Sequence, residues 1–107
     1  MPSPLETIQE RSASPRELVL AIVDAITALD LLERQGSHVL GWEGWLRYSD
    51  GHLGHSERYQ GTTDLSALRP VAAFELCRRT MREAQEEFER SPERNARELL
   101  FCITHDV

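Results

Sequence analysis

Apolar residues recur at three- and four-residue steps in two long stretches of the chain. In the first stretch the apolar positions are Leu18, Ile22, Ala25, Ile26, Leu29 and Leu32. Such spacing places side chains on one face of an α-helix. Ser14, Pro15 and Glu17 fit a capping box with proline at the first helical position, and Gly36 supplies a C-terminal stop. The pattern therefore predicts a helix over about residues 15–35.

The apolar surface of this helix extends further round than one sheet could cover. Leu20 and Leu31 lie on the same side as Asp24 and Thr27. Large apolar side chains gathered on a polar face indicate contact with something beyond a single sheet. The helix is therefore either deeply buried or in contact with another chain.

The second helical stretch covers about residues 70–90. Its apolar stripe consists of Phe74, Cys77, Met81, Ala84 and Phe88. Pro70 suits the first turn of a helix, and Ser91-Pro92 should end it. The other faces carry oppositely charged residues four apart, such as Arg79 and Glu83, which is typical of a solvated surface. Between the two stretches, Thr63 or Asp64 is expected to cap a short helical turn.

Residues 38–60 change to a pattern of aromatic, β-branched and glycine residues around Asp50-Gly51. An Asp-Gly pair between alternating segments predicts a β-hairpin. With a two-residue loop Glu43 faces Arg58, whereas a three-residue loop would set Glu43 against Glu57. Charge therefore favours the two-residue loop.

That register gives the hairpin one apolar and one polar face. The predicted core face carries Leu40, Trp42, Leu46, Tyr48, Leu53 and Tyr59, and the other face carries Glu43, Trp45, Arg47, Ser56 and Arg58. Trp45 is a large aromatic among polar neighbours, and Trp and Arg are enriched at binding hot spots. We therefore expect Trp45, Glu43, Arg47 and Arg58 to bind a partner protein. The alternative is a partly buried Trp45 that lies over the stems of its charged neighbours.

Residues 99–103 are apolar without alternation, which is typical of a strand buried on both faces. The element order becomes α-β-β-α-β. This order predicts an α+β fold with a small mixed three-stranded sheet packed on two long helices, the last strand parallel to the second and paired beside the first. An apolar strand at the edge of such a sheet must be covered. We expect a homodimer through this C-terminal edge strand, with Leu20, Leu31 and Trp45 as further surface for a partner. Cover by the N-terminal arm or a loop is the alternative.

Two domain-level predictions follow from composition along the chain. Residues 1–13 are polar and rich in Pro and Ser, so we expect a loosely ordered arm, although Ser3-Pro4-Leu5-Glu6 could cap a short helix. Residues 14–107 are expected to form a single α+β domain, because this length suits one hydrophobic core.

Charge and cysteine use narrow the function classes. With 12 basic and 18 acidic residues the net charge is −6, which disfavours nucleic acid and membrane surfaces as partners. Cys77 and Cys102 lie in apolar stretches and are expected to be buried thiols rather than a disulfide framework. No targeting pattern or long apolar run is seen, so a cytoplasmic bacterial protein is expected.

The histidines supply the main chemical alternative. Asp50, His52 and His55 are ligand types that suit zinc or nickel, and His105 could join them in space. In an extended strand His52 and His55 point to opposite faces, so they share a metal only if the Gly54 region bulges.

Nucleophilic and anion-binding sites receive little support from the sequence. Ser56 and His55 are also expected on opposite faces, and the apolar surroundings of both cysteines disfavour a thiolate. The glycines lack phosphate-loop or dinucleotide spacing, so no cofactor is expected. The cluster Arg78-Arg79-Arg82 is followed by glutamates and fits a solvated helical face.

Taken together, the sequence predicts a small, acidic, non-catalytic protein-protein interaction module, such as an adaptor, inhibitor or immunity-type protein. The alternative is a small metal-binding or hydrolytic domain that uses His52, His55 and His105.

Overall fold

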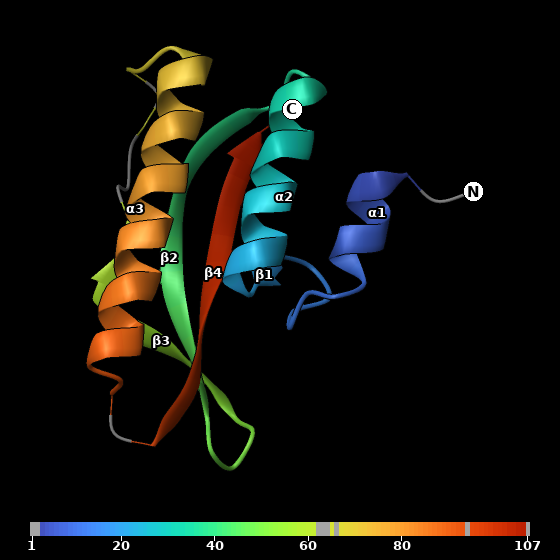
Figure 1. The fold of residues 1–107 in the computed structure, drawn as a ribbon. Helices are drawn as coiled ribbons and strands as arrows, with labels where there is room; N and C mark the ends of the chain where they lie inside the picture. Colours follow the sequence, from blue (N-terminus) through green and yellow to red (C-terminus); the bar gives the residue numbers. More distant parts are fainter. Residues whose placement is uncertain (1–2, 62–64, 66, 94, 107) are drawn as a thin grey trace.

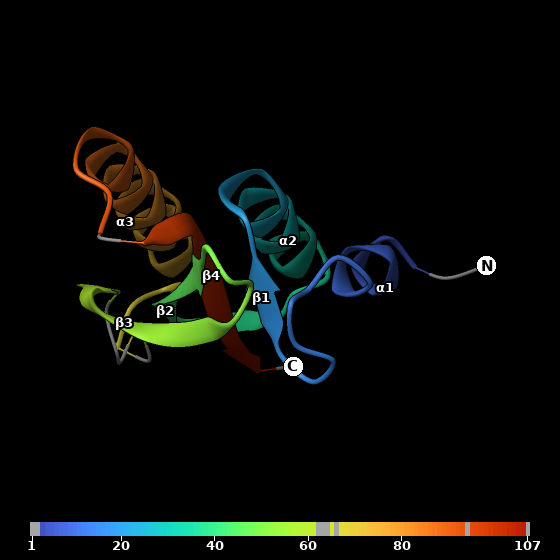
Figure 2. The ribbon, with the colours of Figure 1, turned by 90° about the horizontal axis from the view of Figure 1, so that it is seen from below.

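The computed structural model describes residues 3–61, 65, 67–93 and 95–106. Its elements are α1 (Pro4–Gln9), β1 (Leu18–Leu20), α2 (Ile22–Arg34), β2 (His38–Tyr48), β3 (Leu53–Gln60), α3 (Pro70–Arg90) and β4 (Ala96–Asp106). Within these residues, four strands form one antiparallel sheet in the order β1-β4-β2-β3. Helices α2 and α3 lie side by side on one face of the sheet, and α1 lies beside α2 (Figure 1, Figure 2). The predicted α+β class is confirmed.

Strand β4 lies in the middle of the sheet. Leu99, Phe101 and Ile103 pack with the helices, whereas Leu100 and Cys102 pack on the opposite face. The predicted burial on both faces is therefore confirmed. The prediction of an edge position is wrong, because β4 pairs with β1 on one side and β2 on the other. The expected homodimer through this strand loses its structural basis.

The sheet is antiparallel between all neighbours rather than mixed. As predicted, β4 pairs beside β2 and runs in the same direction as β3. Because β2 lies between β3 and β4, these two strands never form a parallel pair. The fourth strand, β1, was not predicted.

The helix predicted over residues 15–35 is too long at its N-terminal end. Residues Leu18–Leu20 form β1, and α2 begins only at Ile22. Three apolar residues in a row fit helical spacing as well as strand spacing, and pairing with β4 decides between them. Leu20 is buried and Leu31 packs against the core, so neither is free surface for a partner. At the other end Gly36, with φ of 80°, follows the helix as predicted.

Helix α3 matches its prediction closely. The whole predicted stripe is buried: Phe74, Cys77, Met81, Ala84 and Phe88. The helix starts at Pro70 and ends at Arg90, just before Ser91-Pro92. Trp42 of β2 donates a hydrogen bond from Nε1 to Thr80 Oγ1 at 2.9 Å, which fixes α3 over the sheet. The turn capped by Thr63 or Asp64 lies outside the described residues.

The hairpin around Asp50-Gly51 is confirmed, but its predicted two-residue loop is wrong. Trp45 pairs with His55, which leaves a loop of three residues, Ser49–Gly51. Gly51 has φ of 92° and donates its N–H to the carbonyl of Tyr48. A left-handed glycine at the end of a three-residue loop is a common hairpin geometry.

A bulge resolves the charge conflict that had argued against this loop. The register shifts between Glu43 and Trp45, so that Glu43 pairs with Gln60 instead of Glu57 or Arg58. Within the bulged segment Ser56 Oγ accepts a hydrogen bond from the Tyr59 N–H at 3.0 Å. The like-charge pair is therefore avoided by extra residues in β3 rather than by a shorter loop.

The changed register also changes the faces of the hairpin. Of the predicted core residues, Trp42, Leu46 and Tyr59 are buried on the helix side, and Tyr48 packs against them half-buried. The placement of Leu53 was wrong, because it packs on the opposite face.

Ser56 is also buried instead of lying on an exposed polar face, because the bulge turns its hydroxyl toward Tyr59.

Residues 12–13 cover the open edge of β1. Ser12 Oγ accepts a hydrogen bond from the Val19 N–H at 2.8 Å, and the Ala13 N–H donates to the Val19 carbonyl at 2.9 Å. The outward backbone groups of Val19 are thereby satisfied within the chain. In α1, Ser3 Oγ accepts from the Glu6 N–H at 3.1 Å, as the capping pattern predicted, and Ile8 is buried. The division into residues 1–13 and 14–107 stays a prediction.

Within the part of the chain that the structure describes, none of the helices is long and apolar enough to span a membrane.

Candidate functional site

The sheet face turned away from α2 and α3 is here called the outer face (Figure 2). The strand pairing places three cross-strand rows of side chains on it. In the first row Cys102 lies between Val19 and Glu43, and in the second Trp45 lies between Leu100 and His55. In the third row Arg47 lies between Glu98 and Leu53. Side chains directly opposite one another in a ladder are close enough to interact.

The middle of the outer face is an apolar strip. Val19, Leu100 and Cys102 are at most 4% exposed, and Ala13 and Leu53 pack against them. The segment before β1 covers one side of the strip through Ala13. The other side is bordered by the polar side chains of β2 and β3.

Trp45 is held in place at this border. Its Nε1 donates a hydrogen bond to Glu43 Oε1 at 3.2 Å, and its ring centroid lies 4.5 Å from that of His55. His55 Nδ1 lies 3.4 Å from the same Glu43 oxygen. Next to this group Arg47 Nε donates to Glu98 Oε1 at 3.2 Å, with both side chains over a third exposed. The outer face therefore presents a fixed aromatic ring in a frame of charged groups.

Arg58 does not join the residues with which it was predicted. Its Nη2 donates to Glu87 Oε1 of α3 at 2.7 Å, and its guanidinium lies 5.3 Å from the centre of the Tyr59 ring. The bulge in β3 turns Arg58 toward α3, so the four residues predicted to bind a partner do not lie together. Glu43, Trp45 and Arg47 share the outer face, and Arg58 lies against the helix layer.

His55 is the member of this group that sequence reasoning missed. Its place beside Trp45 follows from the three-residue loop, which shifts β3 by one residue relative to the predicted register. The conflict between Glu43 and Glu57 was the signal in the sequence that the pairing could not be regular throughout.

The structure separates the three histidines that the sequence proposed as metal ligands. His52 lies beside the hairpin loop, where its Nδ1 is 2.5 Å from Asp50 Oδ1 and its ring stacks on Tyr48 at 4.6 Å. Hydrogen bonds from the backbone and side chain of His52 lower the pKa of Asp50. His105 pairs with Val39 near the opposite end of β2. Among the described residues, no group of three or more His, Cys, Asp or Glu side chains is placed to hold a metal ion.

The candidate nucleophiles Cys77, Cys102 and Ser56 are all buried, and burial keeps the two thiols protonated. Burial raises the pKa of the Cys77 thiol to about 11. Burial and a hydrogen bond from Sγ to Glu17 Oε2, 3.0 Å long, raise the pKa of Cys102 to about 12. Ser56 is 1% exposed, and its hydroxyl oxygen is engaged by the Tyr59 N–H. A thiol that stays protonated at neutral pH is a poor nucleophile.

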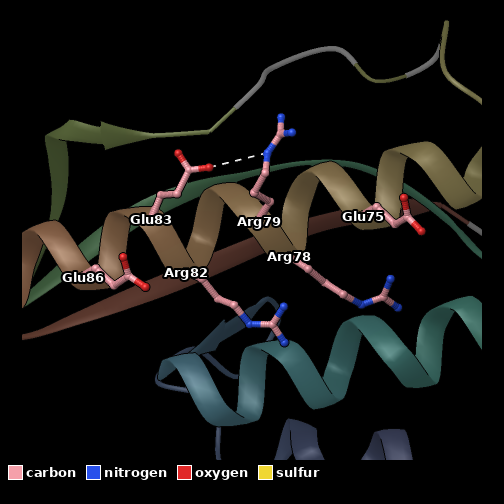
Figure 3. A pocket seen from close by; sticks show the side chains of 6 residues that line it. All are labelled: Glu75, Arg78, Arg79, Arg82, Glu83 and Glu86. Atoms are coloured by element: carbon pink, nitrogen blue, oxygen red, sulfur yellow. Dashed lines mark ion pairs between the residues drawn. The ribbon is translucent and has the colours of Figure 1, made fainter.

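Of the arginine cluster on α3, Arg78 joins the two long helices, so for this residue the prediction of a solvated face is wrong. Figure 3 shows Arg78 and Arg82 pointing toward α2, with Arg79 on the other side. Arg78 Nη2 pairs with Asp30 at 2.8 Å and with Glu33 of α2. The cavity here, about 340 Å³, is lined by three arginines and three glutamates, so its charges largely compensate one another.

Neither a family model, nor a curated protein, nor a solved structure matches this chain. Its function therefore has to be argued from its own residues. Of the places described above, the outer face combines a fixed aromatic ring, an apolar strip and accessible charges on one surface.

Proposed function

We propose that this chain is a small, acidic, non-catalytic protein-interaction module that binds a partner protein through its outer face, with Trp45 at the centre. The supporting observation is the half-buried Trp45, hydrogen-bonded to Glu43 and in tilted ring contact with His55, on the sheet face opposite the two long helices. Aromatic residues and arginine dominate binding hot spots. A ring that is already fixed loses little conformational entropy on association.

The raised thiol pKa values support a non-catalytic function. Cys77 and Cys102, the best nucleophile types in the chain, are protonated and buried. They also lie on opposite sides of the sheet, in separate apolar clusters, so they cannot form a disulfide with each other. Unpaired buried thiols fit a reducing compartment, and we therefore propose a cytoplasmic bacterial protein of the adaptor, inhibitor or immunity type.

The strand edges favour a different protein as partner over a second copy paired edge to edge. The β1 edge is occupied by Ser12 and Ala13. On β3, Gln60 Nε2 donates to the Ser56 carbonyl at 2.8 Å, and the strand carries a bulge. Bulges and locally satisfied backbone groups are devices that protect a strand edge from pairing. The proposed partner therefore binds a face of the sheet rather than its edge.

A comparison of capture by three immobilised chains tests the proposal. The wild type, Trp45→Ala and a control variant, Val23→Ala, are exposed to a lysate of the source organism. Val23 is 74% exposed on α2, in the helix layer, so its truncation leaves the outer face intact. Any protein retained by the wild type is then purified and its affinity for all three chains is measured by calorimetry.

A hot-spot tryptophan predicts that Trp45→Ala weakens this affinity by about 30-fold or more. Val23→Ala should bind within about twofold of the wild type, since surface changes away from a site have small effects. Equal affinity of the wild type and Trp45→Ala would refute the outer face as the binding surface. Urea unfolding of each variant shows that the fold is retained.

A further inference from the structure

A pocket of about 420 Å³ adjoins the Trp45 group on the outer face, between the segment before β1 and the sheet. Glu17, Glu43 and Cys102 are among the residues that line it. Glu17 Oε2 accepts the hydrogen bond from Cys102 Sγ at 3.0 Å. Glu43 stands directly opposite Cys102 in the ladder between β2 and β4. Two carboxylates therefore flank one thiol inside a single pocket.

The thiol between these carboxylates stays neutral. Burial, then the hydrogen bond and the charge of Glu17, and then the charge of Glu43 raise the pKa of Cys102 to about 12. Cys102 therefore adds a donor to the pocket and no charge. The contacts with Cys102, Trp45 and His55 use one oxygen of each carboxylate, Glu17 Oε2 and Glu43 Oε1. Each carboxylate can accept further hydrogen bonds at its second oxygen.

We infer that this pocket receives the guanidinium group of an arginine on the partner protein, an inference that rests on the proposed function. A guanidinium is planar and carries five donors, so it can bond two carboxylates at once. The pocket shares Glu43 with Trp45, so an arginine bound here belongs to the same interface as the aromatic ring. The net charge of −6 also favours association with a basic partner.

Arg16 makes the inference more specific. It lines the same pocket and is exposed, so its own guanidinium can compete for the carboxylates. Removing it should tighten the binding of an incoming arginine. If the incoming arginine bound elsewhere on the surface, truncation of this exposed side chain would leave its affinity unchanged.

The direct test uses a peptide probe, acetyl-Ala-Arg-Ala-amide, with acetyl-Ala-Gln-Ala-amide at equal ionic strength as the uncharged control. Binding is followed by amide chemical shifts of the labelled protein. We expect the arginine peptide, but not the glutamine peptide, to shift the signals of Glu17, Glu43 and Cys102. The double variant Glu17→Gln/Glu43→Gln should weaken this binding by about tenfold or more, because hydrogen bonds to charged groups are being lost. Arg16→Ala should strengthen it.

A matched control removes the same amount of charge elsewhere. Glu83→Gln/Glu86→Gln lies on the exposed surface of α3 and lowers the net negative charge by the same two units. It should bind the probe within about twofold of the wild type, because separated surface charges are largely screened. Equal weakening by the two double variants would overturn the inference, as would an absence of shifts around the pocket.

The capture experiment separates this inference from the proposed function. If Trp45→Ala loses the partner while Glu17→Gln/Glu43→Gln keeps full affinity, the outer face binds the partner and the arginine pocket is refuted. If the peptide binds the pocket but Trp45→Ala keeps its partner, the proposed function fails and the cation site stands.

Discussion

The two faces of the sheet differ in how they are covered and in what they can do. On the helix side the side chains are large and interlocked: Phe101 is fully buried and meets Trp42 edge-on at 5.1 Å. On the outer face the buried strip is made of smaller side chains, Val19, Leu100 and Cys102, with polar groups directly beside them. One face is occupied by the helices of the chain itself. The other is covered partly by Ala13 and partly by the ring of Trp45.

A strand that is apolar on both faces therefore does not by itself indicate contact with a second chain. Both faces of β4 are apolar because each has a local cover, α2 and α3 on one side and the segment before β1 on the other. What remains accessible on the outer face is the ring of Trp45 and its charged neighbours. The inner face should therefore determine stability, and the outer face should determine binding.

Truncation of neighbouring residues on the two faces gives the largest expected effect. Phe101→Ala should cost about 4 kcal/mol of unfolding free energy, because a large buried ring leaves a cavity among fixed side chains. Leu100→Ala should cost about 2 kcal/mol, since side chains of the less tightly covered face can relax into the space. Urea unfolding at neutral pH measures both. A larger loss for Leu100→Ala would show that the outer face contributes more to stability than the helix side.

Alkaline pH probes one thiol on each face. The pKa values of Cys77 and Cys102 are raised from about 9 to about 11 and about 12. The folded state then holds these protons more tightly than the unfolded state. The contribution of each thiol to stability should be fully present below pH 9 and be lost as the pH rises to its folded-state pKa, by at most about 1.4 kcal/mol per pH unit for each thiol.

Variants that each replace one cysteine show how much of the stability lost at alkaline pH comes from each face. Cys102→Ala should remove more of the pH dependence than Cys77→Ala, because its pKa is shifted further. Unfolding free energies between pH 7 and 12 provide the slopes, because the two thiols differ mainly between pH 11 and 12. Unchanged slopes in both variants would contradict the assignment.

The cover of the β1 edge should have a smaller effect. Ser12→Ala removes the acceptor for the Val19 N–H and should cost about 1 kcal/mol. Hydrogen exchange of the Val19 amide should become faster in the variant, because that donor loses its partner. An unchanged exchange rate would show that the arm does not protect this edge.

The smallest expected effect concerns Arg58. Its ion pair with Glu87 lies on the surface, on the helix side, so Arg58→Ala should leave stability and partner affinity unchanged within error. Calorimetry with the captured partner checks the second point. A marked loss of affinity would return Arg58 to the binding set in which the sequence had placed it.

Much of the fold could be predicted because its signals are local. The stripe of α3, its proline start and the apolar run of β4 each lie within one segment. Strand β1 could not be recognised in this way, because three apolar residues carry no period of their own and their pairing depends on β4, at the other end of the chain. Missing β1 led directly to the wrong edge position of β4.

The candidate site could likewise be predicted only where its residues lie on one strand. Glu43, Trp45 and Arg47 alternate along one strand, so their common face followed from the period of a strand. His55 and Arg58 depend on how β3 pairs with β2, and a bulge fixes that pairing. Glu17 joins the pocket only through folding of the segment before β1 across the sheet.

The affinity of Trp45→Ala for the captured partner, measured together with the unfolding free energy of the same variant, decides whether the outer face binds a partner or only stabilises the fold. The proposed division of the faces predicts a loss of about 30-fold in affinity with less than about 1 kcal/mol lost in stability. The opposite result, a protein that is strongly destabilised but still binds its partner at full affinity, would contradict it.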